Sequence, residues 1–386
     1  MKLPIITEFY NSIHKVPVFD KEFMDTTITP LFSRNYLEVL EETQTDVAFG
    51  YIVFRNSITT EVLGFSVVQN ISLNSEQIAS KNFPCKVSYL LRKYILKSIK
   101  LHVLVCGSLF ACGENGFFFN KQKLPPQQAY RALGKALLET AKTHFEYTPS
   151  LILVKEFFQD TFKDSDFIRD QGFVDLSIDV NMSMFIDDSW YTFEDYKQAI
   201  RSKFRNKLKN VYRASSSINI RSLSVQEIRK HTSDINRLYA SVVNKAYFKL
   251  GKLNTLAFEG FKKNLDEQFI FTGFFETDKL IGFTTAIHTQ ETIEAFHIGF
   301  EEKYKKSHSI YQRMLYYFVE LAIDKKATRL QLGRTSETIK SNLGATPLSM
   351  KLYIRHRNRF LNWLLSPIPS YIEPNDFEQR NPFKRK

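Results

Sequence analysis

The sequence has few of the residues that build disulfide frameworks or zinc sites. Only three of its 386 residues are cysteines, Cys85, Cys106 and Cys112, and none has the CxxC spacing typical of zinc ligands. A sparse, odd number of cysteines is typical of a protein from a reducing compartment. The sequence therefore argues against a disulfide-stapled secreted domain, and we expect no metal site.

Long hydrophobic runs are also absent. No apolar run approaches the roughly 18 residues that a membrane-spanning helix needs. The N-terminal stretch MKLPIITEFYNSIHK carries Glu8 and lacks the apolar centre of a signal peptide. The G-x-S-x-G turn typical of many serine hydrolases is missing as well. We expect a cytoplasmic protein that is at most peripheral on the inner face of the cell membrane.

Positive charge and aromatic residues, by contrast, are abundant. The formal net charge is +12, and the chain contains 35 Phe and 18 Tyr. The charge favours anionic partners, namely phosphates, acidic carrier proteins, nucleic acid or anionic lipid surfaces. The aromatic residues are explained by core packing, and they could also line an apolar pocket for a long ligand.

The two halves of the chain repeat one order of elements. The stretches GYIVFRNSITTEVLGFSVVQN and FIFTGFFETDKLIGFTTAIHT each predict two strands joined by a turn, and both second strands begin with an apolar residue followed by Gly-Phe. An amphipathic helix, an apolar strand and a closing segment that starts at a glycine follow in each half. We therefore expect an α/β protein made of two copies of one domain, each with a mixed, mostly antiparallel sheet flanked by helices.

This repeat predicts the domain bounds. The first copy spans residues 1–185 with extra sequence at about 75–100, the second spans 186–358, and residues 359–386 form a basic, aromatic tail. In this tail Phe360 and Trp363 lie close to several arginines, a mixture typical of a membrane interface. A helix packed back on the domain is the alternative, and the terminal PFKRK is expected to be a loose end.

The second half resembles a known family. Residues 190–358 are similar to the FemAB-like and BioF2-like branch of the GNAT acyltransferase superfamily in the stretches RSKFRNKLKNVYRA, GFFETDKLIGFTTAIH and LGRTSETIKSNLGATP. The first half resembles the GNAT fold by its order of elements. The resemblance implies a tandem GNAT-like protein in which an acyl thioester enters a gap between the fourth and fifth strands. The matching stretch GFEEKYKKSHSIYQRM lacks the Q/R-x-x-G-x-G/A loop with which typical GNAT acetyltransferases hold coenzyme A, and several FemAB-like proteins use aminoacyl-tRNA.

The strand ETIEAFHIGF carries two candidate catalytic residues. Strand alternation predicts Glu294 on one face, with Phe296 and Ile298, and His297 on the other face. The resemblance places this strand beside the thioester gap, where either Glu294 or His297 could accept a proton from an attacking amine. A core histidine with satisfied hydrogen bonds is the alternative for His297.

The end of the fifth strand carries candidate substrate-binding residues. Arg334, next to Thr335, could bind a carboxylate or phosphate in bidentate fashion, and Lys340 could point back at the same cavity. The alternative for Arg334 is an ion pair with a local acid. Lys155 and Glu156 occupy the matching position in the first copy.

Two basic stretches are candidates for binding anions. At the start of the helix from Ile310, exposed N–H groups and the helix dipole favour a phosphate of the donor. The candidate residues there are Lys303, Lys305, Lys306 and Ser309. The helix YKQAIRSKFRNKLKNVYRA carries a basic stripe of Lys197, Arg201, Arg205, Lys209 and Arg213. Its expected partners are tRNA, an acidic acyl-carrier protein or anionic lipid headgroups, and a solvated face is the alternative.

These features lead to three functional hypotheses. The first is an N-acyltransferase that moves an acyl group from its co-substrate, an acyl-CoA or acyl-carrier thioester, to an amine acceptor, for which we expect a lipid or cell-envelope precursor. The second is a FemAB-like transferase that depends on aminoacyl-tRNA. The third is a non-catalytic binding protein with the GNAT fold, since fold alone does not prove function. We expect no DNA partner.

Overall fold

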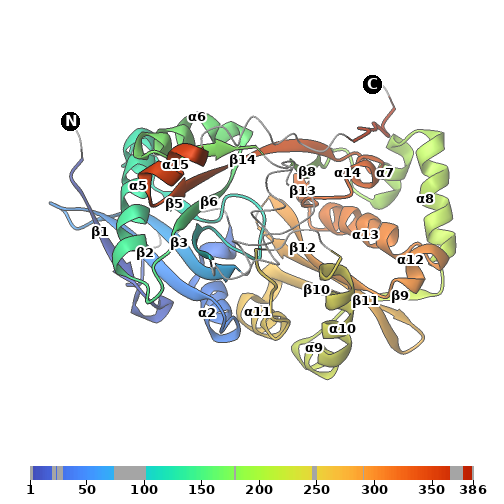
Figure 1. Ribbon diagram of the computed structural model, residues 1–386. Coiled ribbons are helices and arrows are strands. Elements are labelled where there is room, and N and C mark those ends of the chain that lie inside the picture. Colours follow the sequence, from blue (N-terminus) through green and yellow to red (C-terminus); the bar gives the residue numbers. More distant parts are fainter. Residues whose placement is uncertain are drawn as a thin grey trace. The chain divides into compact units, whose positions relative to one another are not determined.

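The structure is a computed structural model of the 386-residue chain (Figure 1). It describes residues 3–19, 23, 29–73, 101–177, 180–245, 250–289, 291–365 and 377–384, so the extra sequence expected at about 75–100 lies outside the described residues. The chain divides into two compact units. Unit 1 consists of Met1–Asp179, Tyr247–Leu253 and Ser349–Pro374, and unit 2 consists of Val180–Ala246, Asn254–Leu348 and Asn375–Lys386.

Unit 1 is built on a mixed sheet with the strand order β1-β2-β3-β4-β6-β14, in which β5 also pairs with β3 and β7 with β14. Its strands are β1 (Ile5–Tyr10), β2 (Ala48–Asn56), β3 (Val62–Leu73), β4 (Leu101–Cys106), β5 (Phe117–Phe119), β6 (Leu151–Phe158), β7 (Val174–Leu176) and β14 (Thr346–His356). Its helices are α2 (Arg34–Thr43), α5 (Pro126–Thr143), α6 (Phe162–Ser165) and α15 (Arg359–Leu365). The apolar stripe of α5 packs on the sheet and completes one core.

Unit 2 is built on a sheet with the strand order β8-β13-β12-β11-β10-β9, in which only β12 and β13 run parallel. Its strands are β8 (Val180–Phe185), β9 (Ile218–Ser222), β10 (Phe269–Glu276), β11 (Lys279–His288), β12 (Thr292–Phe300) and β13 (Arg329–Gln331). Its helices are α7 (Phe193–Ala199), α8 (Ser202–Ala214), α9 (Val225–Lys230), α10 (Thr232–Val243), α11 (Ala257–Leu265), α12 (Lys303–Ser307), α13 (Ile310–Asp324) and α14 (Glu337–Ser341). Helix α13 packs on one face of this sheet through a core shared with β8, β13, α7 and α8.

The local predictions hold well. Both hairpins form, as β2–β3 and β10–β11, and both amphipathic helices form, as α5 and α13. Helix α13 begins without a side-chain hydrogen bond at its N-cap. Ser309 occupies the N-cap position with a φ of 47°, and its hydroxyl makes no capping hydrogen bond. The predicted α/β fold with two mixed sheets is confirmed.

The closing strands do not follow the expected domain bounds. β8, which ends the expected first domain, pairs with β13 and belongs to unit 2. β14, which closes the second half, pairs with β6 and β7, and most of it belongs to unit 1. The compact units therefore differ from the continuous domains 1–185 and 186–358, because each half of the sequence supplies the last strand of the sheet built mainly by the other half.

The expected tail is also divided. Helix α15 belongs to unit 1, whereas residues 377–384 belong to unit 2. Phe383 forms an isolated β-bridge with Ile200, and its ring lies against Gly344, where an added Cβ would collide with it. The terminal PFKRK is therefore held in place as far as Lys384. Among the described residues, no helix combines the length and the apolar character that crossing a membrane requires.

Candidate functional site

Strands β12 and β13 of unit 2 separate after a short parallel ladder. The ladder ends at the pair Glu294–Gln331, yet β12 continues to Phe300. The chain after Gln331 stays with β8, because the N–H of Leu332 donates to the carbonyl of Met182 at 2.8 Å. Among the described strands, none pairs with β12 beyond Glu294 on that side. This opening corresponds to the gap expected between the fourth and fifth strands.

A row of polar side chains crosses the sheet where the opening begins. Glu294 lies opposite Gln331, and Gln331 lies opposite Ser183. Their neighbours along each strand belong to the core beneath α13: Ile293, Leu330 and Met184. The polar side chains therefore share the opposite face of the sheet. Asn181 joins the row from β8, because its amide donates to Oε1 of Gln331 at 3.2 Å.

A β-bulge brings His297 to the same face as Glu294. The register of β11 and β12 shifts at Thr285, so two residues of β12, Phe296 and His297, lie opposite this single residue. The Thr285 hydroxyl accepts from the N–H of His297 at 2.8 Å and donates to its carbonyl at 3.2 Å. The prediction that Glu294 and His297 lie on opposite faces is wrong, because strict alternation does not include the extra residue of a bulge.

Aromatic rings surround the His297 side chain. Its ring centroid lies 4.2 Å from that of Phe296, 5.5 Å from Tyr239 of α10 and 5.7 Å from Phe258 of α11. Within the described residues, Nε2 has no hydrogen-bond partner, so the alternative of a fully satisfied core histidine does not hold. Burial among these rings lowers the pKa of His297 to about 3, and the imidazole is therefore neutral at pH 7.

Burial shifts the pKa of Glu294 in the direction opposite to that of His297. Its side chain is half-buried, and burial raises the pKa of the carboxyl group to about 8, because removal from water disfavours the charged form. A carboxyl group with such a pKa exists in both protonation states near neutral pH. It can therefore accept and release a proton there.

Lys340 is bound to the end of β13. The ammonium, whose side chain is 3% exposed, donates to the carbonyl of Gly333 at 3.0 Å and to that of Arg334. The backbone at Thr335 and Ser336 has positive φ values of 62° and 57°, so this turn needs support. Lys340 therefore holds the turn instead of pointing into a cavity. Substrate binding by the half-buried Arg334 and the exposed Thr335 stays a prediction.

Solved structures share this architecture. FemX aligns with a TM-score of 0.54 at 11% identity, over 86% of this chain and 93% of that chain. A tandem GNAT protein from the clavulanic acid biosynthesis pathway, solved without AcCoA, aligns with a TM-score of 0.53 at 10% identity, over 92% of this chain and 99% of that chain. L-PGS from Bacillus licheniformis aligns with a TM-score of 0.51 at 10% identity, over 89% and 98%.

This chain has the tandem GNAT fold. No protein-family model matches the sequence, and no curated protein matches it either. The likeness to the solved structures is therefore one of fold, and the chemistry of each GNAT unit depends on its own residues.

The first GNAT unit carries a loop where the second has its bulge. β4 and β5 both pair with β3, with Cys106 opposite Val68 and Phe117 opposite Ser66. The loop 107–116 therefore begins where β4 ends and β5 has not yet begun, at the level of Val67 in β3. Val67 lies two residues after the repeated Gly-Phe of its half, as Thr285 does in the other half. The two units thus differ at equivalent positions.

The first GNAT unit also lacks the carboxylate of the second. Val105 pairs with Gln69, and Glu294 pairs with Ile287. Gln69 and Ile287 each lie four residues after the Phe of the repeated Gly-Phe, so Val105 takes the place of Glu294. At the position equivalent to the candidate base, unit 1 therefore carries an apolar side chain.

Lys155 and Glu156 hold the loop 107–116 in unit 1. The Lys155 ammonium donates to the carbonyls of Ser108 at 2.5 Å and Ala111 at 3.3 Å, and the Glu156 carboxylate accepts from the N–H of Gly113 at 2.8 Å. The two side chains form an ion pair at 3.4 Å and are 6% and 1% exposed. The structure gives them this structural role and no support for the expected contact with a substrate.

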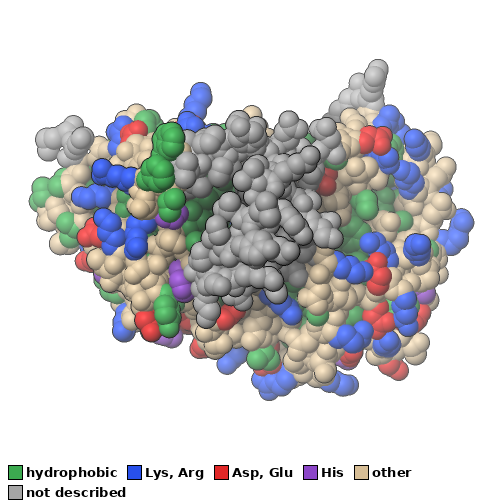
Figure 2. Space-filling view, viewed as in Figure 1, with side chains coloured by type: hydrophobic (Ala, Val, Ile, Leu, Met, Phe, Trp, Pro, Cys, Tyr) green, Lys and Arg blue, Asp and Glu red, His purple; other side chains and the backbone are tan. Residues whose placement is uncertain are grey.

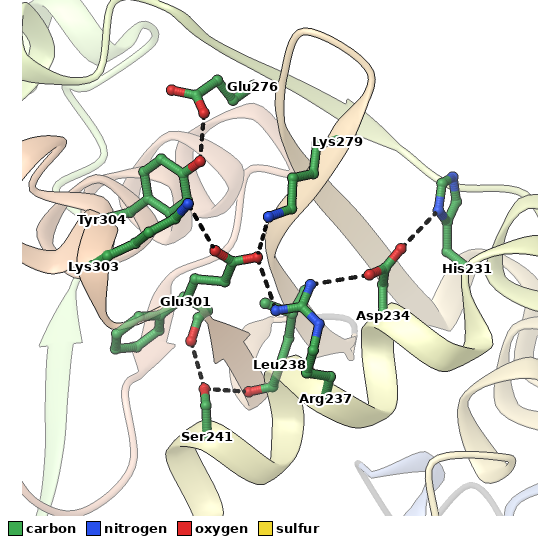
Figure 3. Close-up of polar contacts among 11 residues, drawn as sticks. His231, Asp234, Arg237, Leu238, Ser241, Glu276, Lys279, Glu301, Lys303 and Tyr304 are labelled. Carbon is green, nitrogen blue, oxygen red and sulfur yellow. Dashed lines mark hydrogen bonds and ion pairs between the residues drawn. The ribbon is translucent and has the colours of Figure 1, made fainter.

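Glu301 ties together the end of β12 and the basic residues around it (Figure 3). Its carboxylate lies 2.8 Å from Arg237, 2.7 Å from Lys279 and 3.5 Å from Lys303. Burial acts to raise the pKa of Glu301, but Lys279 and Arg237 outweigh it and lower the pKa. Lys303 therefore already has a carboxylate beside it.

The other residues of the expected phosphate site before α13 differ in their partners. Lys305 lies 3.7 Å from Glu302. Lys306 is exposed, and within the described residues no carboxylate forms an ion pair with it. Donor-phosphate binding here stays a prediction, with Lys306, Ser309 and the N-terminus of α13 as its strongest elements.

The predicted continuous basic helix is wrong, because the chain is extended at Ile200, with a ψ of 148°. Lys197 lies on α7 and forms an ion pair with Glu194. Arg201 is the N-cap residue of α8, and its N–H donates to the carbonyl of Pro382 at 2.8 Å. The bridge between Ile200 and the C-terminal segment explains the break.

Helix α8 presents a row of cations, of which Lys203 and Lys207 lie near the Glu378 carboxylate. It buries the apolar stripe of Phe204, Leu208 and Val211. No ion pair within the described residues includes its cations, which are Arg201, Lys203, Arg205, Lys207, Lys209 and Arg213. Figure 2 shows Lys and Arg side chains gathered over α8. Burial, Arg380 and Lys203 together lower the pKa of Lys207, as expected for cations that crowd one another.

Proposed function

We propose that unit 2 catalyses acyl transfer from a thioester to an amine, with Glu294 as the general base. The opening between β12 and β13 carries this proposal, because the β12 backbone continues without a β13 partner directly after Glu294. A thioester laid in the opening brings its carbonyl carbon close to this carboxylate. Backbone N–H groups along such a strand edge can stabilise the oxyanion of the tetrahedral intermediate.

Glu294 suits the role of base better than His297. A general base is most effective when its pKa lies near the working pH, and the pKa of Glu294 is raised to about 8. The pKa of His297 is lowered to about 3, so its imidazole holds a proton too weakly to remove one from an amine. We assign His297 a hydrogen-bonding role through Nε2.

The reaction requires one proton acceptor and accurate positioning. The amine nitrogen forms a bond to the thioester carbonyl carbon, and Glu294 takes the proton that the nitrogen loses. The intermediate then collapses by breaking the C–S bond, and the departing thiolate takes up a proton. The products are an amide and a free thiol. Holding the amine beside the carbonyl supplies much of the acceleration in such reactions.

The polar row beside Glu294 favours an acceptor with hydrogen-bonding groups near its amine. The Ser183 hydroxyl and the Asn181 carbonyl oxygen are buried, and within the described residues neither has a hydrogen-bond partner. Both lie on the face that Glu294 and Gln331 share. An amine of a lipid headgroup or a cell-envelope precursor would provide such groups, and an acyl-CoA or acyl-carrier protein would provide the thioester.

Native mass spectrometry of the full chain tests the donor. We expect a complex with at least one of acetyl-CoA, palmitoyl-CoA or palmitoyl-acyl-carrier protein, and release of free thiol when amines are added. The E294Q variant should keep the complex and lose thiol release, because the substitution removes the base and leaves the opening intact. If wild-type protein binds none of the three thioesters, thioester-dependent transfer is ruled out.

A second candidate is transfer from aminoacyl-tRNA, and the unpaired cations of α8 favour it. A protein that neutralises phosphates with Lys and Arg releases counterions, so its affinity falls steeply with salt. The solved FemX structure shares the tandem fold. In transfer from aminoacyl-tRNA, Glu294 is again the general base. The bond that breaks is the ester between the amino acid and the tRNA.

Filter binding with total tRNA tests this candidate. The K203E/K209E variant should bind at least about tenfold more weakly than wild type, with a smaller slope against salt concentration. The matched control is K142E/K163E, which has the same change in net charge at exposed lysines of unit 1. Equal binding by the two variants would show that α8 does not contact tRNA.

A further inference from the structure

Helix α15 exposes a cluster of large apolar side chains. Phe360 and Trp363 are each 66% exposed, and Leu361 is 42% exposed. The rings of Phe360 and Trp363 lie next to each other, with centroids 6.1 Å apart. Other large apolar residues that are exposed in the described chain occur singly, which is normal for a protein surface. The three on α15 fall within four residues, and Figure 2 shows hydrophobic side chains where Figure 1 places this helix.

Hydrogen bonds fix which way this helix faces. The Asn358 side chain accepts from the N–H of Phe360 at 2.9 Å and from that of Leu361 at 3.2 Å, which caps the helix. On the opposite side, the Asn362 amide donates to the carbonyl of Gly172 at 2.9 Å. Asn362 therefore anchors α15 to unit 1, and the apolar side chains point away from the anchor.

Three arginines accompany the apolar cluster. Arg357 and Arg359 are exposed and Arg355 is half-buried. Within the described residues, none of them takes part in an ion pair. Burial and the charge of Arg359 lower the pKa of Arg355. Arg355 and Arg359 therefore repel each other, and within the described residues no ion pair compensates their charge. An external anionic surface would supply that compensation.

We propose that α15 docks the protein on an anionic lipid surface. Trp and Phe at the helix surface insert at the level of the headgroups, and neighbouring arginines bind lipid phosphates; this combination holds a helix at a membrane interface. A two-turn helix offers much less area than the roughly 800 Å² per partner of a stable protein interface. Docking through α15 does not depend on the acyl transfer proposed for unit 2.

Vesicle co-sedimentation of the full chain tests the docking. The probes are vesicles of equimolar phosphatidylglycerol and phosphatidylcholine, and vesicles of phosphatidylcholine alone. We expect binding to the first, weakened by salt, and little binding to the second. The affinity for the anionic vesicles should fall by about tenfold or more in F360A/W363A and in R357E/R359E.

Two controls separate docking by α15 from binding through another surface of the protein. Y191A removes an exposed aromatic side chain of unit 2. K142E/K163E changes the net charge as much as R357E/R359E does, at exposed lysines of α5 and α6. Both variants should bind the anionic vesicles like wild type. Thermal melts of all variants check folding. Equal binding of the two vesicle types by wild type, or wild-type binding by F360A/W363A, would overturn the proposal. A third outcome would also overturn it: the wild type binds no vesicles but self-associates, and F360A/W363A loses this self-association. The face of α15 would then be a contact between copies of the chain.

Discussion

Replacing Glu294 with glutamine should lower the turnover number by about 10²–10⁴-fold, the usual contribution of a general base. In the wild type, kcat/KM should rise with pH and level off above about pH 8, because the base works only when ionised and its pKa is raised to about 8. A base with the pKa of His297, about 3, would give a flat profile between pH 5 and 9. H297Q should therefore keep the rising profile, and E294Q should lose it.

The stability of E294Q provides the control for this experiment. In the unfolded chain the carboxyl group has its ordinary pKa of 4.5, and in the folded protein the pKa is about 8. Below both pKa values the carboxyl group is neutral in the folded and the unfolded state, so its ionisation does not change the free energy of unfolding. As pH rises from 4.5 towards 8, ionisation increasingly favours the unfolded chain. E294Q should therefore match wild type near pH 4 and melt at a higher temperature near pH 9. If E294Q melts lower at the assay pH, its lost turnover reflects misfolding and not a missing base.

Replacing Lys155 with methionine should destabilise unit 1 by about 3–5 kcal/mol, the usual effect of removing one partner of a buried ion pair. The substitution leaves the Glu156 carboxylate, which is 1% exposed, without its cation, and it strips the carbonyls of Ser108 and Ala111 of a donor. For a unit of this size, the melting temperature should fall by about 6–20 °C. Calorimetry on the full chain measures the change.

K163M is the matched control, because Lys163 is an exposed lysine of the same unit. Its effect should stay within about 0.5 kcal/mol. The double variant K155M/E156Q should recover part of the loss, since no uncompensated charge then stays buried. If K155M melts like K163M, the loop 107–116 does not depend on the Lys155–Glu156 pair.

The fold was predictable where the signal is local. A turn between two apolar runs is enough to predict the hairpin that joins Glu276 to Lys279, and apolar spacing is enough to predict α5 and α13. The pairing of the closing strands could not be predicted in this way. β8 and β14 have patterns that fit either sheet, and their partners are selected by packing between residues distant in the sequence.

The site was predictable only in part. The resemblance located the strand of Glu294 and so made it a candidate, but the bulge that turns His297 to the same face leaves no mark in the sequence. Lys340 was expected to point into the cavity, and backbone carbonyls that no pattern reveals bind it instead. Ser183 and Gln331 were missed although a signal existed. In NMSMF and LQL, polar residues alternate with Met or Leu, which indicates a strand with one polar face.

The pairing of β14 with β6 sets the order in which the protein can be completed on the ribosome. β6 is synthesised before unit 2, whereas its neighbour β14 emerges only after most of unit 2 has been made. Until then one edge of β6 has unsatisfied N–H and C=O groups, which are a template for pairing with other chains. Closing so large a loop is slow compared with forming the local hairpins. Completion of the first unit thus waits until most of the second has been synthesised, and chains that stop before β14 should aggregate through that edge.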